Sequence, residues 1–205
     1  MRVYTLAFAL ILTVGGSSAS AQTGVSFVVK AGANFANLDF SGDDVDVSFD
    51  RRVGLVAGAF MLFPMTETFG FQVEGLYSQK GARFEEDGFE GSIRLDSFDV
   101  PVLARYTIPS STDTSFHLFA GPSFAFKLSA KSKTSFDGED DEEEDISDDI
   151  EGLDVGVVIG AGLEFGRFVV DGRYTHGLTN LNKAEDNAGV EIKSRVFSIM
   201  AGFRF

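Results

Sequence analysis

The chain ends in the stretch RVFSIMAGFRF, residues 195–205, in which apolar residues occupy every second position. From position 197 onward, one set of alternate residues is Phe, Ile, Ala, Phe and Phe, and the set between them is Ser, Met, Gly and Arg. Successive side chains of a β-strand point to opposite faces of a sheet. The spacing of two therefore predicts a strand with one uniformly apolar face and one mixed face.

The same alternation occurs seven more times upstream, so the sequence predicts eight strands. No charged residue lies on their apolar faces, and the opposite faces combine glycine, small polar residues and isolated charges. The apolar faces lie within residues 25–35, 53–63, 69–77, 98–108, 116–128, 153–165, 168–178 and 197–205. A water-soluble barrel is the alternative, but its outward face would be rich in Lys and Glu. An inward face with much glycine and few charges instead fits the crowded interior of a narrow barrel, and the apolar outward face then contacts lipid.

The connections between these strands alternate in length. Residues 64–68, 109–114 and 166–167 are short turns, whereas residues 39–51, 84–91, 132–152 and 180–191 are long and polar. Strands of roughly 10 residues, short periplasmic turns and long external loops are typical of bacterial outer-membrane barrels. We therefore expect residues 23–205 to form an all-β, eight-stranded antiparallel up-and-down transmembrane β-barrel of the outer-membrane type. The mature N-terminus and Phe205 both lie on its periplasmic side.

The first 21 residues have the pattern of a cleaved Sec signal peptide. Arg2 provides a positive start, residues 6–14 are apolar, and Ala19-Ser20-Ala21 supplies the small residues of a cleavage site. A membrane anchor helix is the alternative, but the apolar run falls short of the roughly 20 residues that span a bilayer. We expect export and an integral location in the bacterial outer membrane, with outer-membrane lipid as a partner.

Composition excludes several classes of protein. The chain has no cysteine, so it forms neither a disulfide framework nor a thiolate metal site, and we expect no metal or cofactor. Its net charge of −14 repels nucleic acid, which we therefore exclude as a partner.

Several charged residues lie at the alternate strand positions that face the barrel interior. An eight-stranded barrel is just wide enough to be filled by side chains, so ions inside it are expected to pair with one another. We predict a structural interior charge network in which the carboxylates accept hydrogen bonds from the cations. An ion path or gate is the alternative interpretation. Its members are Lys30, Glu74, Arg105, Glu164, Asp171, Arg173 and Arg204, and Asp99 and Asp154 point the same way.

The loop at residues 132–152 is strongly acidic. Residues 137–151 contain eleven carboxylates, seven of them consecutive, and such a run repels itself. We expect a disordered, solvated external loop, with weak and diffuse Ca²⁺ binding as the alternative.

The two histidines offer little basis for an enzyme. His117 falls on the inner face near the periplasmic end, and His176 falls on the lipid-facing parity near the external end, so they share no site. A pairing of His176 with Ser194 on the neighbouring strand is the remaining catalytic alternative. We expect no catalytic residues. Outward aromatic residues near the strand ends are expected to form two girdles at the lipid boundaries.

Several strands resemble the PorT-like outer-membrane β-barrel family. The matching stretches are VVKAGANFANL (28–38), FDVPVLARY (98–106), FAGPS (119–123), GAGLEF (160–165), RYTHGLTN (173–180) and RVFSIMAGFRF (195–205). The resemblance implies a small outer-membrane barrel, a possible link to type IX protein secretion, and no catalytic motif.

We therefore expect a non-enzymatic structural or accessory envelope component with a periplasmic or secretion-complex partner. The C-terminal strand ending in Phe205 fits the signal read by the barrel assembly machinery. A narrow pore or transporter for small solutes, or a surface adhesin acting through the external loops, are the alternative functions.

Overall fold

The fold was analysed in a computed structural model that describes residues 24–41, 50–86, 89–110, 114–136, 142–183 and 191–205. The predicted signal peptide lies outside the described residues. One short 3₁₀ helix, η1 (Ser147–Asp149), accompanies the strands in this part of the chain. The strands are β1 (Ser26–Ser41), β2 (Asp50–Pro64), β3 (Phe69–Glu86), β4 (Phe89–Ile108), β5 (Thr114–Phe136), β6 (Glu142–Asp145), β7 (Leu153–Phe165), β8 (Phe168–Gly177) and β9 (Glu191–Arg204).

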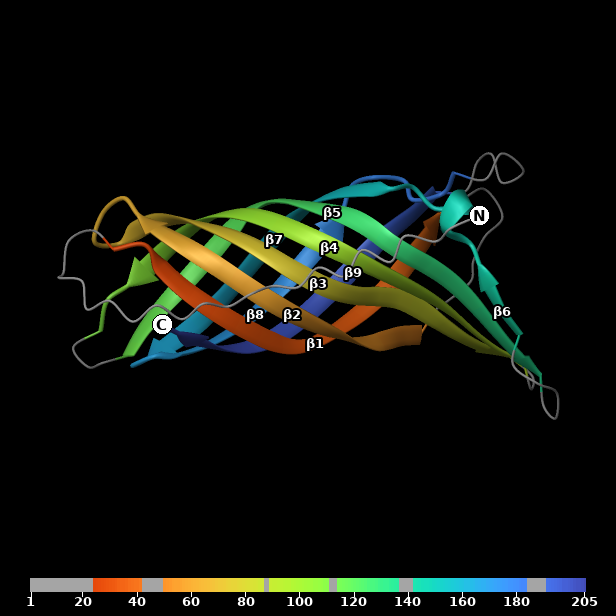
Figure 1. The fold of residues 1–205 in the computed structure, drawn as a ribbon, viewed down its shortest axis with the longest axis horizontal. Helices are drawn as coiled ribbons and strands as arrows, with labels where there is room; N and C mark the ends of the chain where they lie inside the picture. Colours follow the sequence, from red (N-terminus) through yellow and green to blue (C-terminus); the bar gives the residue numbers. More distant parts are fainter. Residues whose placement is uncertain (1–23, 42–49, 87–88, 111–113, 137–141, 184–190) are drawn as a thin grey trace, which may run out of the picture.

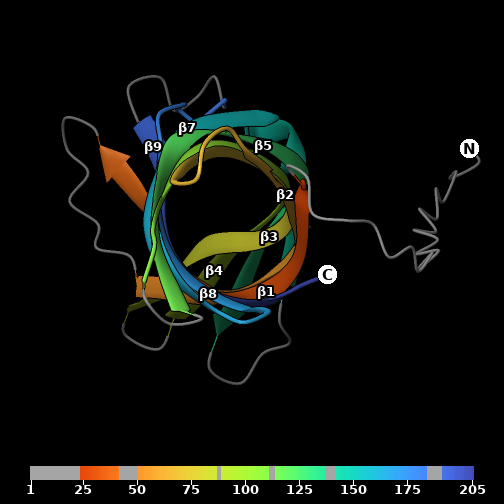
Figure 2. The same cartoon turned by 90° about the vertical axis from the view of Figure 1, so that its left-hand side faces the viewer.

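Eight of the described strands close into a barrel, which confirms the predicted fold class. Each strand from β1 to β5 pairs antiparallel with the next, β5 pairs with β7, and β7, β8 and β9 follow in order. The pairing of β1 with β9 completes the ring, which Figure 2 shows end-on. The short strand β6 lies outside the ring and pairs with the distal part of β5. Among the described residues, no helix is long and apolar enough to cross a membrane.

The short turns and the C-terminus share one end of the barrel, on the left in Figure 1. The backbone N–H of Phe205 donates to the carbonyl of Phe27 at 3.0 Å, which ties the end of the chain to the start of β1. At the same end, Gly166 and Arg167 connect β7 to β8 in a two-residue turn. Gly166 has a φ of 59°, which tight hairpin turns require and which glycine adopts without strain. This end is the periplasmic end of an outer-membrane barrel.

The outward face carries the large apolar side chains that the alternation predicted. Phe, Leu, Ile and Val point outward along all eight barrel strands, and their neighbours in sequence point inward. At the periplasmic end, aromatic rings touch across neighbouring strands from β7 to β1. The centroids are 5.9 Å apart for Phe165–Phe168, 5.6 Å for Phe168–Phe203, 5.4 Å for Phe203–Phe205 and 6.1 Å for Phe27–Phe205. These rings form an aromatic girdle at one lipid boundary.

Three strands are much longer than predicted. β3, β4 and β5 contain 18, 20 and 23 residues, and they project past the other strands at the external end (Figure 1). The loop predicted at residues 84–91 was therefore wrong, because β3 continues to Glu86 and β4 begins at Phe89. Beyond the bilayer the outward face of a strand meets water, so the apolar alternation that marks a transmembrane strand disappears while the hydrogen-bonded pairing continues.

The acidic loop is also more ordered than predicted. Residues 142–145 form β6, which pairs with residues 131–134 of β5. The ammonium group of Lys131 contacts Glu143, and this hydrogen bond lowers the pKa of the Glu143 carboxyl. A hydrogen bond from Ser147 likewise lowers the pKa of Asp145. Nearby lysines thus offset the repulsion that led us to expect disorder; residues 137–141 of the loop lie outside the described residues.

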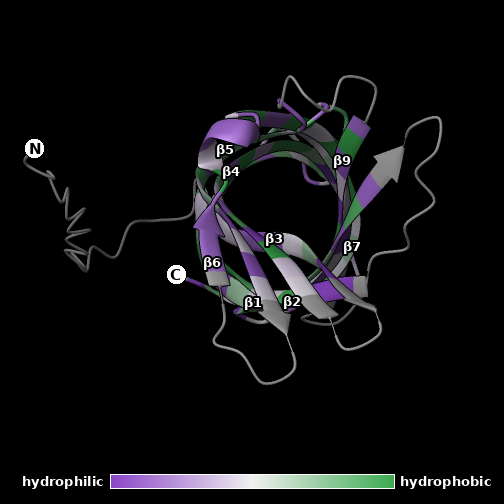
Figure 3. Cartoon of the chain, turned by 90° about the vertical axis from the view of Figure 1, so that its right-hand side faces the viewer, coloured by the Kyte–Doolittle hydropathy of each residue, from purple (hydrophilic) through white to green (hydrophobic). Residues whose placement is uncertain are grey.

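The rest of this loop folds back over the external mouth of the barrel. Lys127 donates hydrogen bonds to the carbonyls of Ser147 and Ile150, and the N–H of Glu151 donates to the carbonyl of Leu181 at 2.9 Å. These bonds join two external segments at the external rim, the end of the barrel that faces the viewer in Figure 3. An apolar cluster forms beneath them from Leu38, Ala82, Ile93, Leu95, Ala130, Ile146, Ile150, Leu181 and Ile192.

Candidate functional site: the barrel interior

Glu74 lies at the centre of the interior charge network. The ammonium group of Lys30 is 3.1 Å from Glu74 and 3.3 Å from Asp171. The guanidinium of Arg173 donates to both oxygens of Glu74, at 2.7 and 3.0 Å, and to Asp171 at 3.1 Å. All four side chains are at least 97% buried. Two cations and two carboxylates from β1, β3 and β8 therefore neutralise one another away from water.

A second group continues the network toward the periplasmic end. Arg105 donates to Glu164 at 2.6 Å and to the amide oxygen of Gln72 at 3.2 Å. Gln72 in turn donates to Glu74, which joins this group to the central one. Arg204 contacts the other oxygen of Glu164 and is partly exposed. The structure thus brings all seven residues of the predicted network together.

Every strand of the barrel contributes a side chain to this layer. β1, β3, β4, β7, β8 and β9 supply the charged groups, and β2 and β5 supply aromatic rings. Lys30 lies 5.1 Å from the ring centre of Phe60, and Arg173 lies 4.9 Å from that of Phe119. Such contacts stabilise a buried cation through the negative face of the ring. The layer therefore closes the lumen from all sides.

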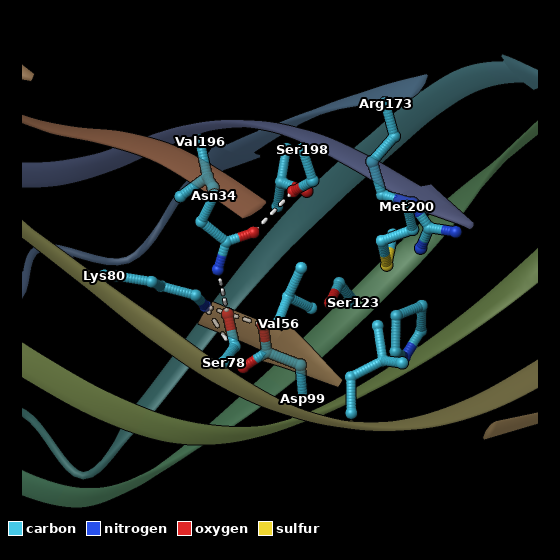
Figure 4. Close-up of a pocket in the computed structure, with 13 residues that line it drawn as sticks. Asn34, Val56, Ser78, Lys80, Asp99, Ser123, Arg173, Val196, Ser198 and Met200 are labelled. Atoms are coloured by element: carbon cyan, nitrogen blue, oxygen red, sulfur yellow. Dashed lines mark hydrogen bonds and ion pairs between the residues drawn. The ribbon is translucent and has the colours of Figure 1, made fainter. Parts of the chain in front are cut away.

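The sequence reasoning missed a second polar layer nearer the external end. Lys80 pairs with Asp99 at 2.9 Å, the amide of Asn34 donates to Ser78 at 2.8 Å, and Ser198 donates to Asn34 at 2.7 Å. Figure 4 shows these groups around a cavity of about 20 Å³, which is large enough for one water molecule but too small for a solute. Lys80 lies at an inward position of β3, but it falls beyond residues 69–77, where the alternation predicted this strand.

The histidines and Ser194 do not form a catalytic set. His117 is buried inside the barrel and stacks on Phe119 with ring centres 5.8 Å apart. His176 lies on the outward face beside Tyr174, at 6.4 Å between ring centres. Ser194 points inward and donates to Asp154 at 2.5 Å, so the suggested pairing of His176 with Ser194 was wrong. In the register His176 lies opposite Arg195, which places Ser194 on the other face of the sheet.

The interior offers no evident place for a bound metal. Across the residues that the structure describes, no group of three or more His, Asp or Glu side chains is arranged to hold an ion. The buried carboxylates at the centre already bind Lys30 and Arg173. The geometry describes a packed layer of ion pairs whose chemistry is charge neutralisation and strand positioning.

A closed eight-stranded barrel with lipid-facing apolar residues and a polar interior defines an integral outer-membrane β-barrel protein. In agreement, residues 20–183 match the family model described as "Outer membrane protein beta-barrel domain". The chain belongs to this family. A comparison with curated proteins finds no significant match.

Solved outer-membrane barrels have a similar fold. Ail, the attachment invasion locus protein of Yersinia pestis, is 20% identical over 88% of this chain and 99% of its own, with a TM-score of 0.46. Neisserial surface protein A is 15% identical over 89% and 99%, with a TM-score of 0.47. OprG from Pseudomonas aeruginosa is 11% identical over 90% and 97%, with a TM-score of 0.48.

Proposed function

We propose that this protein is a non-enzymatic structural or accessory component of the outer membrane that acts through its turns and external segments. The observation that carries the proposal is the filled lumen. One layer draws ionic or aromatic side chains from all eight barrel strands, and an apolar cluster occupies the external mouth. A solute would have to displace both layers, so the geometry disfavours the narrow pore or transporter.

Single-channel recording tests the closed lumen. We expect the purified protein to give no stable open state in a planar bilayer, because the central ion pairs and the external apolar cluster leave no continuous water path. A well-characterised porin reconstituted in parallel controls for insertion and detection. Reproducible unitary currents from the folded barrel would contradict the proposal and favour the pore.

The link to protein secretion is the more specific part of the proposal. It is supported by the resemblance of residues 28–38 and 195–205 to PorT-like barrels. It also agrees with a filled barrel that leaves only its two ends for contact with other proteins. The projecting strands β3–β5 favour surface attachment as a second candidate, because they present a large area beyond the lipid boundary.

Site-specific cross-linking distinguishes the two ends. The chain has no cysteine, so Ser110→Cys in the periplasmic β4–β5 turn, or Lys183→Cys at the external end, introduces a unique attachment point. In native envelopes we expect Ser110→Cys to capture defined periplasmic or secretion-complex subunits that Lys183→Cys does not. Capture from the external position alone would favour surface attachment. Recovery of only lipid and the barrel from the periplasmic position would remove the support for secretion.

A further inference from the structure

Three buried nitrogen atoms at the periplasmic end of the lumen have no hydrogen-bond partner. They are Nε of Arg105, Nε of Arg204 and Nδ1 of His117. Two other buried side-chain atoms share this condition among the residues that the structure describes, and both are oxygens nearer the external end, of Asn37 and Asp154. Buried polar groups are nearly always hydrogen-bonded, and Nε of arginine is always a donor. The periplasmic end of the lumen therefore lacks an acceptor.

These nitrogen atoms surround a single carboxylate. Arg105 and Arg204 both pair with Glu164, and the other printed bond of Arg105 goes to Gln72. Both bonds to the carboxylate come from Nη2 atoms, so each Nε–H group stays available. His117 lies close enough to Arg105 and Glu164 to interact electrostatically with both. One carboxylate thus serves two guanidinium groups without satisfying either completely.

A cavity of about 90 Å³ lies beside Arg105, beneath the turn that joins β2 to β3. Figure 2 shows this turn at the rim of the periplasmic opening. The cavity is much larger than the cavity of about 20 Å³ in Figure 4, so it has room for a ligand larger than water. Thr107 lies opposite His117 in the register, which places the cavity at the level of the unpaired nitrogens. Apolar and hydroxyl residues share the lining, which includes Leu62, Pro64, Phe69, Thr66, Thr68 and Thr107.

The charges at the rim balance one another. Glu67 also lines the cavity and is exposed at the β2–β3 turn, and Arg167 is exposed at the β7–β8 turn. The carboxylate of Phe205 ends the chain at the same side of the barrel. Water and salt screen such exposed charges. An anion is therefore favoured by the unpaired donors inside the lumen, where two guanidinium groups share one carboxylate, and not by a positive surface.

We propose that the periplasmic end of the lumen binds a carboxylate that is presented from the periplasm. The carboxylate accepts a charge-assisted hydrogen bond from the free Nε–H of Arg105, and the carbon chain that carries it lies against Leu62 and Pro64. A glutamate side chain combines such an aliphatic stem with a terminal carboxylate. A doubly charged phosphate would meet stronger repulsion from Glu67. This site goes beyond the accessory role proposed above and does not depend on it.

Heteronuclear NMR of the full mature protein in detergent micelles tests the proposal, because each arginine Nε–H group gives its own signal. The probes are acetate, the peptide acetyl-Ala-Glu-Ala-amide and its neutral glutamine analogue. We expect the Arg105 signal, assigned by its loss in Arg105→Lys, to shift saturably with the glutamate peptide and not with the glutamine peptide. Tighter binding of the peptide than of acetate identifies a protein chain as the source of the carboxylate, and equal binding identifies a small free carboxylate.

Substitutions then locate the bound carboxylate. Arg105→Lys keeps a cation for Glu164 and removes the Nε–H group. Followed through the backbone amide of Gly70, which lines the cavity, binding of the glutamate peptide should weaken at least about tenfold, as expected for one hydrogen bond to a charged group. The matched control Arg167→Lys makes the same change at an exposed turn and should leave the affinity unchanged.

The migration of unheated samples on a gel verifies that each variant folds. If Arg105→Lys does not fold, Thr107→Val replaces it, because it removes a hydroxyl from the cavity lining and leaves the ion pairs intact. An Arg105 signal that moves with neither acetate nor the glutamate peptide would show that only water reaches these nitrogens, and would overturn the proposal. Equal shifts with the glutamate and glutamine peptides, or equal weakening in Arg167→Lys, would overturn it as well.

Discussion

Replacing Glu74 with glutamine is expected to lower the free energy of unfolding by about 3–5 kcal/mol, the usual cost of removing one partner from a buried ion pair. Glu74 is the carboxylate shared by Lys30 and Arg173, at 3.1 and 2.7 Å, and no solvent reaches it. Without its charge, two buried cations share only Asp171. Urea unfolding of the barrel in lipid vesicles, followed by the loss of the compact band on unheated gels, measures the change.

Two further variants show whether the charge network causes this loss. Glu67→Gln makes the same chemical change at an exposed turn and is expected to alter stability by less than about 0.5 kcal/mol. Glu74→Gln/Arg173→Met removes one charge of each sign and leaves the Lys30–Asp171 pair at 3.3 Å, so its loss should be smaller than the sum of the two single losses. If Glu74→Gln is as mild as Glu67→Gln, the ion pairs do not stabilise the barrel.

An arginine at the centre of the lipid-facing surface is expected to be nearly as harmful. Ile159 is midway along β7 and its side chain is 62% exposed outside the barrel. The variant Ile159→Arg should therefore cost about 2–4 kcal/mol, the range for arginine at the bilayer midplane. The same unfolding assay in vesicles measures it.

The depth of the substitution provides the control. Leu153→Arg places the same residue on the same strand and face but at its external end, where about 0–1 kcal/mol is expected. Equal costs at both positions would show that Ile159 lies no deeper in the hydrocarbon layer than Leu153. A harmless Ile159→Arg would contradict the assignment of this face to lipid.

Sequence alone was sufficient to predict most of the charge network. Lys30, Glu74 and Arg173 are far apart in the chain, but each occupies an inward position of an alternating strand. In a narrow closed barrel, inward charges have only one another as partners. The alternation of inward and outward positions, together with the narrow lumen of an eight-stranded barrel, therefore predicted which residues meet. It did not predict that Gln72 joins the two groups of ions, because neutral amides carry no comparable requirement for a partner.

Outside the bilayer the same reasoning failed, and the external parts of β2–β5 show why. The register of β2 against β3 shifts between Arg51 and Val56, and Gly81 on β3 has a φ of 138° with the carbonyl of Ile93 packed against it. Neither feature changes the apolar pattern, and the start of β4, residues 89–93, pairs with residues 132–136 of β5, which were predicted to be loop. The folding of the acidic segment onto β5, near Lys127 and Lys131, was missed for the same reason.

What the sequence determined by itself is the transmembrane barrel: the number of its strands, the face of each that meets lipid, and the charges that fill the interior. These follow from a period of two imposed by hydrocarbon on one side and a narrow lumen on the other. The tertiary structure alone decided how far β3–β5 project and how the external mouth closes. In water neither face of a strand is obliged to be apolar, so only the contacts between distant segments specify those features.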